Sequence, residues 1–310
     1  MKKNKIDLTN LKEKYKKGIN ITKLLNEGLS KNSTSSIEIA YDLQSGSYVD
    51  GALSNGINSE KIRQMSNIIN PYLETGSRIL DCGTGELTTL TSLINNFNNE
   101  DIDVYCFDLS LSRLLYGKEY SEKVIKKDSS LKNLTLFSAE LDNIPIVDNS
   151  IDVVISNNAL EPNHGNESKI LSEILRVASK KVILFEPSYE NNSIEGKKRM
   201  EELGYVRGIP GHVKANGGKL ESVLKIKNVK NPLNPTHAYI ITPPNAILSN
   251  RSKSVLACPI TKKPVKLYRD CVYSDESLFA YPVISGIPIL RSSHAIVASH
   301  YNSVDIDWKK

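Results

Sequence analysis

The sequence lacks any apolar run near the roughly 20 residues that a membrane-spanning helix needs. No apolar stretch of signal-peptide length follows the lysines near its N-terminus. Cysteine is scarce: Cys82, Cys106, Cys258 and Cys271 occur among 310 residues, and their positions do not suggest a disulfide framework. We therefore expect a cytoplasmic protein with reduced thiols and no membrane span.

A basic folded body is also lacking. Lys and Arg outnumber Asp and Glu by 40 to 35, but residues 1–17 hold seven lysines against Asp7 and Glu13, which accounts for the net charge of +5. A nucleic-acid enzyme usually carries its positive charge on the folded face that meets phosphate. The pattern indicates a solubilising, partly frayed N-terminal end and favours a small-molecule partner over nucleic acid.

Strand-like apolar segments alternate with helical patterns through the middle of the chain. We expect strands at 78–82, 103–107, 134–137, 151–156 and 181–185, and helices at 58–73, 87–97, 111–125, 169–178 and 194–203. Segments 224–229 and 238–242 have no helix between them and should form an antiparallel hairpin at one edge. This order predicts an α/β, Rossmann-like fold whose seven-stranded, mainly parallel sheet is covered on both faces.

Three units are expected along the chain. Residues 1–57 form an N-terminal tail and helical cap, in which Tyr41–Tyr48 lies over the edge of the main domain. Residues 58–244 form the main α/β domain, and the polar stretch through Ser249–Ser254 is a linker. Residues 253–295 form a small β-rich domain, because their proline-rich turns and short strands differ from the preceding pattern.

A glycine-rich turn follows the first expected strand, in the sequence R-I-L-D-C-G-T-G-E of residues 78–86. Gly83 and Gly85 allow backbone angles closed to other residues and let a ligand approach the main chain. A dinucleotide fingerprint would need a third glycine, but Thr88 stands at that position. Asp81 and Glu86 would repel a pyrophosphate, whereas they suit a cationic ligand that carries an amino group and a sulfonium.

Asp108 ends the next expected strand, which should lie beside the first one. A carboxylate at the end of this strand can accept hydrogen bonds from both ribose hydroxyls of a nucleoside. The same aspartate can instead cap the following helix, and the two roles are compatible. Together with Asp81, it points to a cationic nucleoside as the ligand.

Four blocks, in order, resemble the class I methyltransferases, in particular the branch similar to ubiquinone and menaquinone biosynthesis C-methyltransferases. They are I-L-D-C-G-T-G-E (79–86), V-Y-C-F-D-L-S (104–110), F-S-A-E-L-D-N-I-P (137–145) and D-N-S-I-D-V-V-I-S-N-N-A-L-E (148–161). The resemblance implies methyl transfer with S-adenosyl-L-methionine as cofactor. The cofactor-binding residues that it implies are Asp81, Cys82, Gly83, Thr84, Gly85, Glu86, Asp108, Leu109, Ser138, Ala139, Glu140, Asn157 and Asn158.

Two departures from the family pattern concern the cofactor. Leu87 stands where relatives often have a third glycine, and Ser138 stands where they more often have an aspartate for the adenine amino group. The backbone of Ala139 and the side chain of Glu140 are alternatives on the adenine side. The loop after the fourth strand lacks the N-P-P-aromatic signature of enzymes that methylate planar amides or exocyclic base amines, which disfavours those reactions.

Methyl transfer is an in-line displacement at a sulfonium methyl, so the protein mainly positions both partners. A general base is needed only if the acceptor must lose a proton. The candidates are His164, which is the first choice, Glu161, and His212 in an irregular loop before the hairpin. A plain surface-loop role is the alternative for each histidine. Tyr41 and Tyr48 either close over the cofactor or simply pack the cap.

Residues 255–290 resemble the small zinc-ribbon-like family that includes methyltransferase activators and short bacterial relatives, most specifically in L-F-A-Y-P-V-I-S-G-I-P-I-L. A tetrahedral zinc site would need two C-x-x-C pairs. Thr261 and Ser274 replace the second cysteine of each pair and leave only Cys258 and Cys271, so we expect no structural metal. The resemblance implies a built-in stabiliser or activator, and an addition without effect on catalysis is the alternative.

The expected function is therefore methylation of a small molecule, such as a sugar or an intermediate of cell-surface or natural-product biosynthesis. One alternative is a tRNA or protein methyltransferase that is helped by the activator-like domain. Another is a non-catalytic partner protein that binds the cofactor or has lost it. A nicotinamide-dependent enzyme is disfavoured by the acids at positions 81 and 86.

Overall fold

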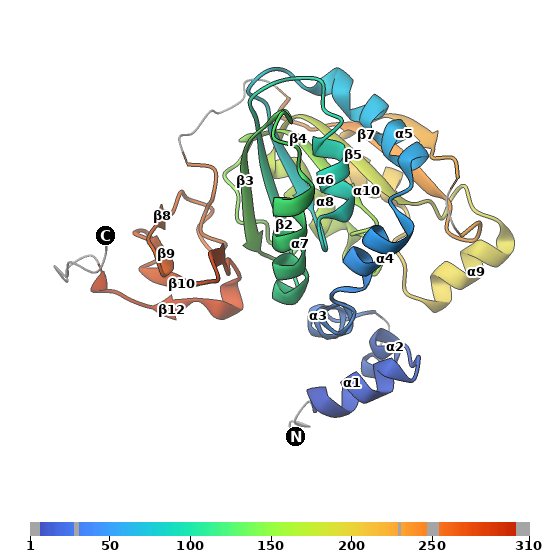
Figure 1. The fold of residues 1–310 in the computed structure, drawn as a ribbon, viewed down its shortest axis with the longest axis horizontal. Helices are drawn as coiled ribbons and strands as arrows, with labels where there is room; N and C mark the ends of the chain where they lie inside the picture. Colours follow the sequence, from blue (N-terminus) through green and yellow to red (C-terminus); the bar gives the residue numbers. More distant parts are fainter. Residues whose placement is uncertain (1–6, 28–30, 229–230, 247–253, 302–310) are drawn as a thin grey trace.

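A seven-stranded sheet forms the centre of the molecule (Figure 1). The computed structural model describes residues 7–27, 31–228, 231–246 and 254–301. The strand order is β3-β2-β1-β4-β5-β7-β6, in which β1 to β5 are parallel and β7 is antiparallel to both neighbours. The strands are β1 (Arg78–Cys82), β2 (Ile102–Asp108), β3 (Leu131–Ser138), β4 (Ile151–Asn157), β5 (Ala178–Pro187), β6 (Lys219–Lys225) and β7 (Thr236–Thr242). This confirms the Rossmann-like sheet with a terminal hairpin.

Helices cover both faces of the sheet because successive strand residues point to opposite sides. Ile79 and Leu80 of β1 are both fully buried, yet they belong to two different apolar clusters. One cluster takes side chains from α8 (Glu167–Val177) and α10 (Ile209–Ala215), and the other from α5 (Ser59–Ile69), α6 (Thr88–Ile94) and α7 (Leu111–Val124). This layering leaves the carboxyl ends of the strands open to a ligand.

Two expected segments differ from the structure near the hairpin. The loop expected around His212 is the helix α10, because Pro210 occupies its first turn, where proline is tolerated, and Ile209 and Val213 are buried. β6 occupies Lys219–Lys225 instead of 224–229, since these residues pair with β7. The remaining expected strand residues, of which Val229 lies outside the described residues, belong to the connection toward β7.

Four short helices lie below the sheet in Figure 1 and form the N-terminal cap. They are α1 (Leu8–Lys16), α2 (Ile21–Leu25), α3 (Thr34–Leu43) and α4 (Ser47–Asn55). Leu11, Ile21 and Ala40 are buried together in a small core. The chain is helical from Leu8 onward, while Lys2, Lys3 and Lys5 lie outside the described residues.

A second, antiparallel sheet of five strands forms the C-terminal domain. Its strands are β8 (Lys266–Leu267), β9 (Cys271–Ser274), β10 (Phe279–Ile284), β11 (Ile287–Pro288) and β12 (Ile296–Val297). The domain docks beside β3, where the Leu290 N–H donates to the Ser138 carbonyl at 2.8 Å and the Ala257 N–H donates to the Pro145 carbonyl at 2.9 Å. Val255 joins one of the two main apolar clusters, so the two domains share a core. Most of the expected linker, residues 247–253, lies outside the described residues.

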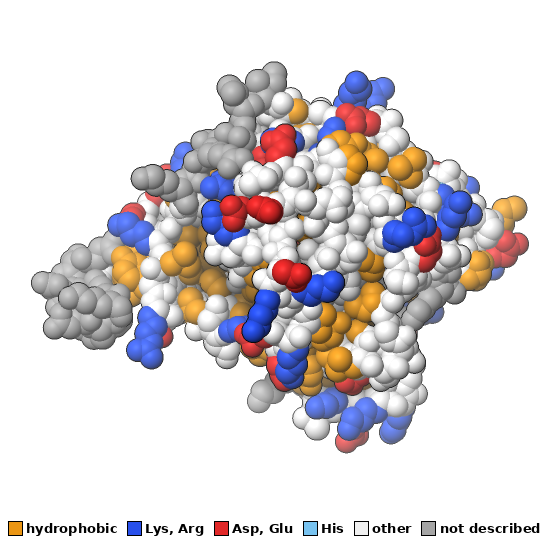
Figure 2. Space-filling model, turned by 45° about the horizontal axis from the view of Figure 1, so that its top comes forward, with side chains coloured by type: hydrophobic (Ala, Val, Ile, Leu, Met, Phe, Trp, Pro, Cys, Tyr) orange, Lys and Arg blue, Asp and Glu red, His pale blue; other side chains and the backbone are white. Residues whose placement is uncertain are grey.

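The surface carries charges of both signs. Figure 2 shows Lys and Arg side chains interspersed with Asp and Glu over the face in view. None of the described helices has the length and apolar character needed to cross a bilayer.

Candidate active site

The glycine-rich turn lies at the carboxyl end of β1 and leads into α6. Gly83 and Gly85 have φ angles of +70° and +60°, which glycine adopts without steric cost. A Cβ atom on Gly83 would lie 2.5 Å from the Cβ of Ala159, in the loop after β4. The turn therefore requires glycine both for its angles and for its close approach to the neighbouring loop.

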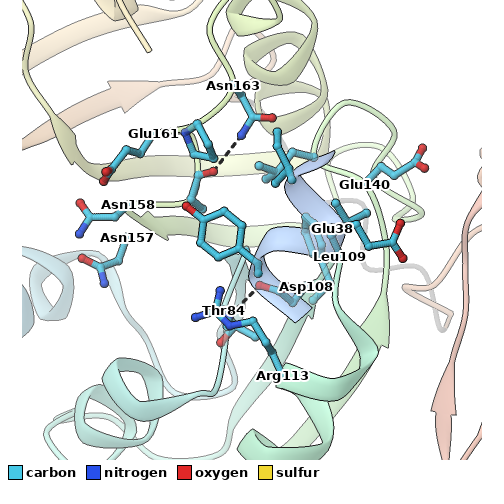
Figure 3. Close-up of a pocket in the computed structure, with 18 of the residues that line it drawn as sticks. Glu38, Thr84, Asp108, Leu109, Arg113, Glu140, Asn157, Asn158, Glu161 and Asn163 are labelled. Carbon is cyan, nitrogen blue, oxygen red and sulfur yellow. Dashed lines mark hydrogen bonds between the residues drawn. The ribbon is translucent and has the colours of Figure 1, made fainter. Parts of the chain in front are cut away.

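A cavity of about 210 Å³ opens over this turn. Asn157, Asn158 and Glu161 lie on one side of it, and Glu38 and Glu140 lie on the opposite side (Figure 3). The sequence-predicted cofactor residues that line it are Gly83, Thr84, Gly85, Glu86, Asp108, Leu109, Ala139, Glu140, Asn157 and Asn158. Three others, Asp81, Cys82 and Ser138, are buried behind the lining.

Asp108 lies on the floor of the cavity, with its side chain directed into it (Figure 3). Its Oδ2 accepts a hydrogen bond from the Gly85 N–H and its Oδ1 accepts one from the Ser110 N–H, each at 2.9 Å. Each carboxylate oxygen keeps a further lone pair for a ligand, so the residue fits two adjacent ribose hydroxyls. The helix-capping role considered for Asp108 belongs to Ser110, whose hydroxyl accepts from the Arg113 N–H.

Replacing Asp108 by alanine should weaken S-adenosylhomocysteine binding by on the order of 1–3 kcal/mol, the range for hydrogen bonds to a charged group. Titration calorimetry measures this affinity directly. Asp108→Asn is the matched control, because it keeps the shape and one acceptor oxygen and should lose less. An unchanged affinity in a folded Asp108→Ala variant would contradict the ribose assignment.

Asp81 lies beneath the turn, 6% exposed. Burial raises the pKa of this carboxyl to about 7, and the charge of Asp108 also raises it. A cation in the cavity would favour the ionised carboxylate, so the residue can respond to a positively charged ligand without touching it. Burial also raises the pKa of the adjacent Cys82 thiol, which therefore packs as a neutral side chain.

Glu86 has a structural task that the sequence did not indicate. Its Oε1 accepts a hydrogen bond from the Gly46 N–H at 3.1 Å, and its Oε2 accepts one from the Val49 N–H at 2.8 Å. Both backbone groups lie at the beginning of α4. The carboxylate thus fastens the N-terminal cap to the glycine-rich turn, although part of the side chain also lines the cavity.

Arg113 of α7 completes the contact between cap and turn. Its guanidinium carbon lies 5.2 Å from the centre of the Tyr41 ring and 4.9 Å from that of Tyr48, and its Nε lies 3.8 Å from Glu86 Oε1. All four side chains line the cavity. The two tyrosines lie at the cavity, and their closing over a cofactor stays a prediction. Arg113 was not predicted, because an arginine in a helix usually faces solvent.

The side of the cavity that is formed by Glu38 and Glu140 contacts the C-terminal domain. The guanidinium of Arg291 donates two hydrogen bonds to the Glu38 carboxylate, at 2.6 and 3.0 Å, and one to Glu140 Oε1 at 3.2 Å. Glu38 belongs to α3 and Glu140 follows β3, and both line the cavity. We call this group the Arg291 clamp. Ser138 contributes only from behind, since its hydroxyl donates to the Leu109 carbonyl.

Lys61 of α5 reaches the opposite side of the cavity. Its Nζ donates a hydrogen bond to Asn157 Oδ1 at 2.8 Å. Burial lowers the pKa of this lysine, while the carboxylates of Glu186 and Glu161 act to raise it. The sequence did not indicate a role for Lys61, because a lysine in an amphipathic helix is ordinarily exposed to solvent.

Glu161 is the catalytic candidate that the structure brings to the cavity. Its carboxylate receives hydrogen bonds from the Tyr205 hydroxyl and from Asn234 Nδ2, the latter at 3.4 Å. Burial raises its pKa, and the charges of Arg199 and Lys61 partly oppose this effect. A partly buried carboxylate with a raised pKa is suited to act as a proton acceptor.

The two histidine candidates lie elsewhere. His164 Nδ1 is 2.7 Å from Glu167 Oε1, at the beginning of α8, and His164 does not line the cavity. His212 lies on α10 and does not line it either. Their catalytic roles stay predictions, without a contact to the cavity to support them.

The C-terminal cysteines are separate from the cavity. Burial alone would raise the pKa of Cys258, but hydrogen bonds from Ser277, Tyr281 and backbone N–H groups lower it to about 7. Cys271 lies on β9 and is partly exposed. Among the residues that the structure describes, no three His, Cys, Asp or Glu side chains are grouped as metal ligands.

Comparisons with solved structures agree with the fold. A chain from the complex of the Haloferax volcanii Trm112 methyltransferase activator aligns with a TM-score of 0.51 at 16% identity, over 66% of this chain and 97% of that chain. Magnesium protoporphyrin IX methyltransferase from Synechocystis, solved with bound S-adenosylhomocysteine, aligns at 0.45 and 14% identity, over 76% and 99%. An S-adenosylmethionine-dependent methyltransferase from Aquifex aeolicus aligns at 0.42 and 18% identity, over 60% and 99%. These likenesses concern the fold alone.

A search of curated proteins finds no match. A family model described as a methyltransferase domain matches residues 73–234, which is just over half of the chain and runs from the segment before β1 to the loop before β7. The match includes the glycine-rich turn that would cradle a cofactor and the carboxylate that would hold a ribose. The chain belongs to the methyltransferase domain family and is an S-adenosylmethionine-dependent methyltransferase.

Proposed function

We propose that this enzyme methylates a hydroxyl or amino group of a polar small molecule, with Glu161 as the proton acceptor. The observation that supports this most is the place of Glu161, which lines both the cofactor cavity and a second, larger hollow. That hollow, which we call the N-terminal cleft, lies between α1–α4 and the segment Glu201–Tyr205. Tyr41, Tyr48 and Pro162 also line both spaces, so an acceptor in the cleft can reach the cofactor cavity beside Glu161.

The residues of the cavity suit S-adenosylmethionine. Asp108 would hold the ribose, Ala139 and Glu140 would border the adenine, and the glycine-rich turn with Asn157 and Asn158 would border the methionine part. When bound, S-adenosylmethionine supplies an electrophilic methyl group. The chain then has to align the acceptor with that methyl group, exclude water and hold the acceptor's proton at Glu161.

The charges of the cleft favour a small molecule over RNA. The charged residues that line it are Lys23 and Lys31 together with Glu27, Glu161, Glu201 and Glu202. A surface that binds a phosphate backbone needs an excess of positive charge. The described lining of the cleft has no such excess, which supports a metabolite as acceptor.

We also propose that the C-terminal domain supports catalysis from within the chain, as a built-in activator. The Arg291 clamp is the contact that supports this, because it joins that domain to two residues of the cofactor cavity. The solved Haloferax volcanii complex, by its description, contains a separate methyltransferase activator. A closer relation to the ubiquinone branch, and a zinc-ribbon-like origin of the domain, stay expectations from the sequence.

A labelling experiment tests the proposed acceptor class. The full chain is incubated with methyl-labelled S-adenosylmethionine and, separately, with the metabolite, tRNA and protein fractions of a cell extract. We expect label in a low-molecular-weight product and none above background for Glu161→Gln. Label that enters tRNA or protein instead would overturn the small-molecule proposal.

A further inference from the structure

Two buried amide oxygens near Glu161 have no hydrogen-bond partner among the described residues. They are Asn158 Oδ1 and Asn234 Oδ1. Asn234 bonds Glu161 through its other amide atom, and Asn158 lines the cofactor cavity together with Glu161. Buried polar groups in native proteins are nearly always paired, so two unpaired amide oxygens near one carboxylate indicate a place where a ligand supplies the partners.

The unpaired atoms define what the ligand must offer. Both are amide oxygens, which need hydrogen-bond donors, and the Lys61 ammonium, which lines a side hollow with them, has N–H groups that need acceptors. A hydroxyl group can both donate and accept a hydrogen bond. A hydrocarbon can do neither, and a quinone ring carries acceptors only. Asn158 and Asn234 also line a side hollow with Lys61, Thr236 and further asparagines, namely Asn58, Asn228 and Asn231. Several hydroxyls at different positions of one molecule would satisfy these groups.

The N-terminal cleft provides apolar side-chain surface next to these polar atoms. Tyr41, Tyr48 and Tyr205 line the N-terminal cleft next to Glu161. Tyrosine combines a flat apolar face with a polar tip. A ligand with an apolar ring face and hydroxyls around its edge would contact the rings and the amide groups at the same time.

We propose that the methyl acceptor is a carbohydrate, bound with one hydroxyl at Glu161 and others at Asn158 and Asn234. This inference rests on the proposed function. The reacting hydroxyl gives its proton to the Glu161 carboxylate while its oxygen forms a bond to the methyl carbon. The bond between that carbon and sulfur breaks, its electron pair stays on sulfur, and a methyl ether and a neutral thioether result. The sugar can be free or linked to a nucleotide, because the same hydroxyls are recognised.

The test uses the full chain saturated with S-adenosylhomocysteine and saturation-transfer NMR with defined probes. Glucose, galactose and N-acetylglucosamine represent free sugars, UDP-N-acetylglucosamine represents a nucleotide-linked sugar, and geraniol and catechol represent apolar and phenolic acceptors. We expect that only the sugar probes bind. Comparison of the free sugars with UDP-N-acetylglucosamine then shows whether the acceptor is a free or a nucleotide-linked sugar. Binding of geraniol or catechol without any sugar, or of none of the probes, overturns the inference.

Variants connect binding to the proposed site. Asn234→Ala should weaken the affinity for a bound sugar by about tenfold, the effect of losing a partner in a buried site. The affinity of this variant for S-adenosylhomocysteine should stay unchanged. The matched control is Asn133→Ala, at an exposed position of β3, which should bind both the sugar and S-adenosylhomocysteine as wild type does. If Asn234→Ala binds the sugar as tightly as wild type does, the proposed location of the sugar site is wrong. Failure of the wild type to bind S-adenosylhomocysteine would instead count against the proposed function.

Discussion

Replacing Glu161 by glutamine should lower the turnover number by about 10²- to 10⁴-fold, the contribution usual for a general base. Glutamine keeps the size of the side chain and can still accept the hydrogen bond from Tyr205, but it cannot take up a proton. The affinity for S-adenosylhomocysteine should stay at the wild-type value, because Glu161 lies on the acceptor side of the cavity. Steady-state kinetics with an identified acceptor and calorimetry with the product nucleoside separate the two effects.

The pH dependence gives an independent check of the same role. Burial raises the pKa of Glu161 above that of an ordinary glutamate. The base is active as the carboxylate, so kcat/KM should be high above this pKa and should fall as the pH decreases through it. The acidic limb of the profile should disappear in Glu161→Gln, which has no group to titrate at this position.

Two comparisons make the result specific. Glu190→Gln is the matched control, because Glu190 is an exposed carboxylate that bonds the Gly208 N–H away from the cavity. His164→Gln tests the competing base, and we expect its turnover to stay near the wild-type value, since His164 faces Glu167. A large loss in His164→Gln together with a small loss in Glu161→Gln would contradict the assignment and restore the histidine.

The sheet and the cofactor side could be predicted because their signals are local. Apolar strands, a glycine-rich turn and an acid at the end of a strand occupy short continuous segments, so Gly83, Gly85 and Asp108 were placed from neighbouring residues alone. The parallel topology then brings the ends of adjacent strands together at one edge. Each of these three residues lines the cavity.

Three charged residues of the site could not be predicted because they depend on contacts between distant segments. They are Lys61, Arg113 and Arg291, which come from two helices and a separate domain, and each is wholly or partly buried by partners far away in the sequence. A charged residue in an amphipathic pattern is usually solvated, so its burial is invisible until the tertiary contacts are known. The role of Glu86 could not be predicted for the same reason. Its negative charge suggested a contact with the ligand, but its carboxylate accepts hydrogen bonds from the beginning of α4.

Replacing Arg291 by methionine should lower the free energy of unfolding by about 3 kcal/mol, at the lower end of the range for breaking a buried ion pair. The lower end applies because the Glu38 side chain is 33% exposed and regains water when its partner is lost. Arg291 joins the C-terminal domain to α3 and to the segment after β3, so its loss should also weaken cofactor binding. Chemical denaturation and calorimetry with S-adenosylhomocysteine measure the two effects.

The comparison of variants shows whether the geometry of the Arg291 clamp matters beyond its charge. Arg291→Lys keeps the positive charge but cannot form the paired hydrogen bonds to Glu38, so it should recover only part of the stability and affinity. The matched control is Arg269→Met, because Arg269 is exposed on the same domain. If Arg291→Met unfolds more easily but binds the nucleoside with unchanged affinity, the C-terminal domain stabilises the fold without shaping the cavity. A parallel loss of both would show that the domain acts on the cofactor site, because Glu38 and Glu140 contact Arg291 on one side and border the cavity on the other.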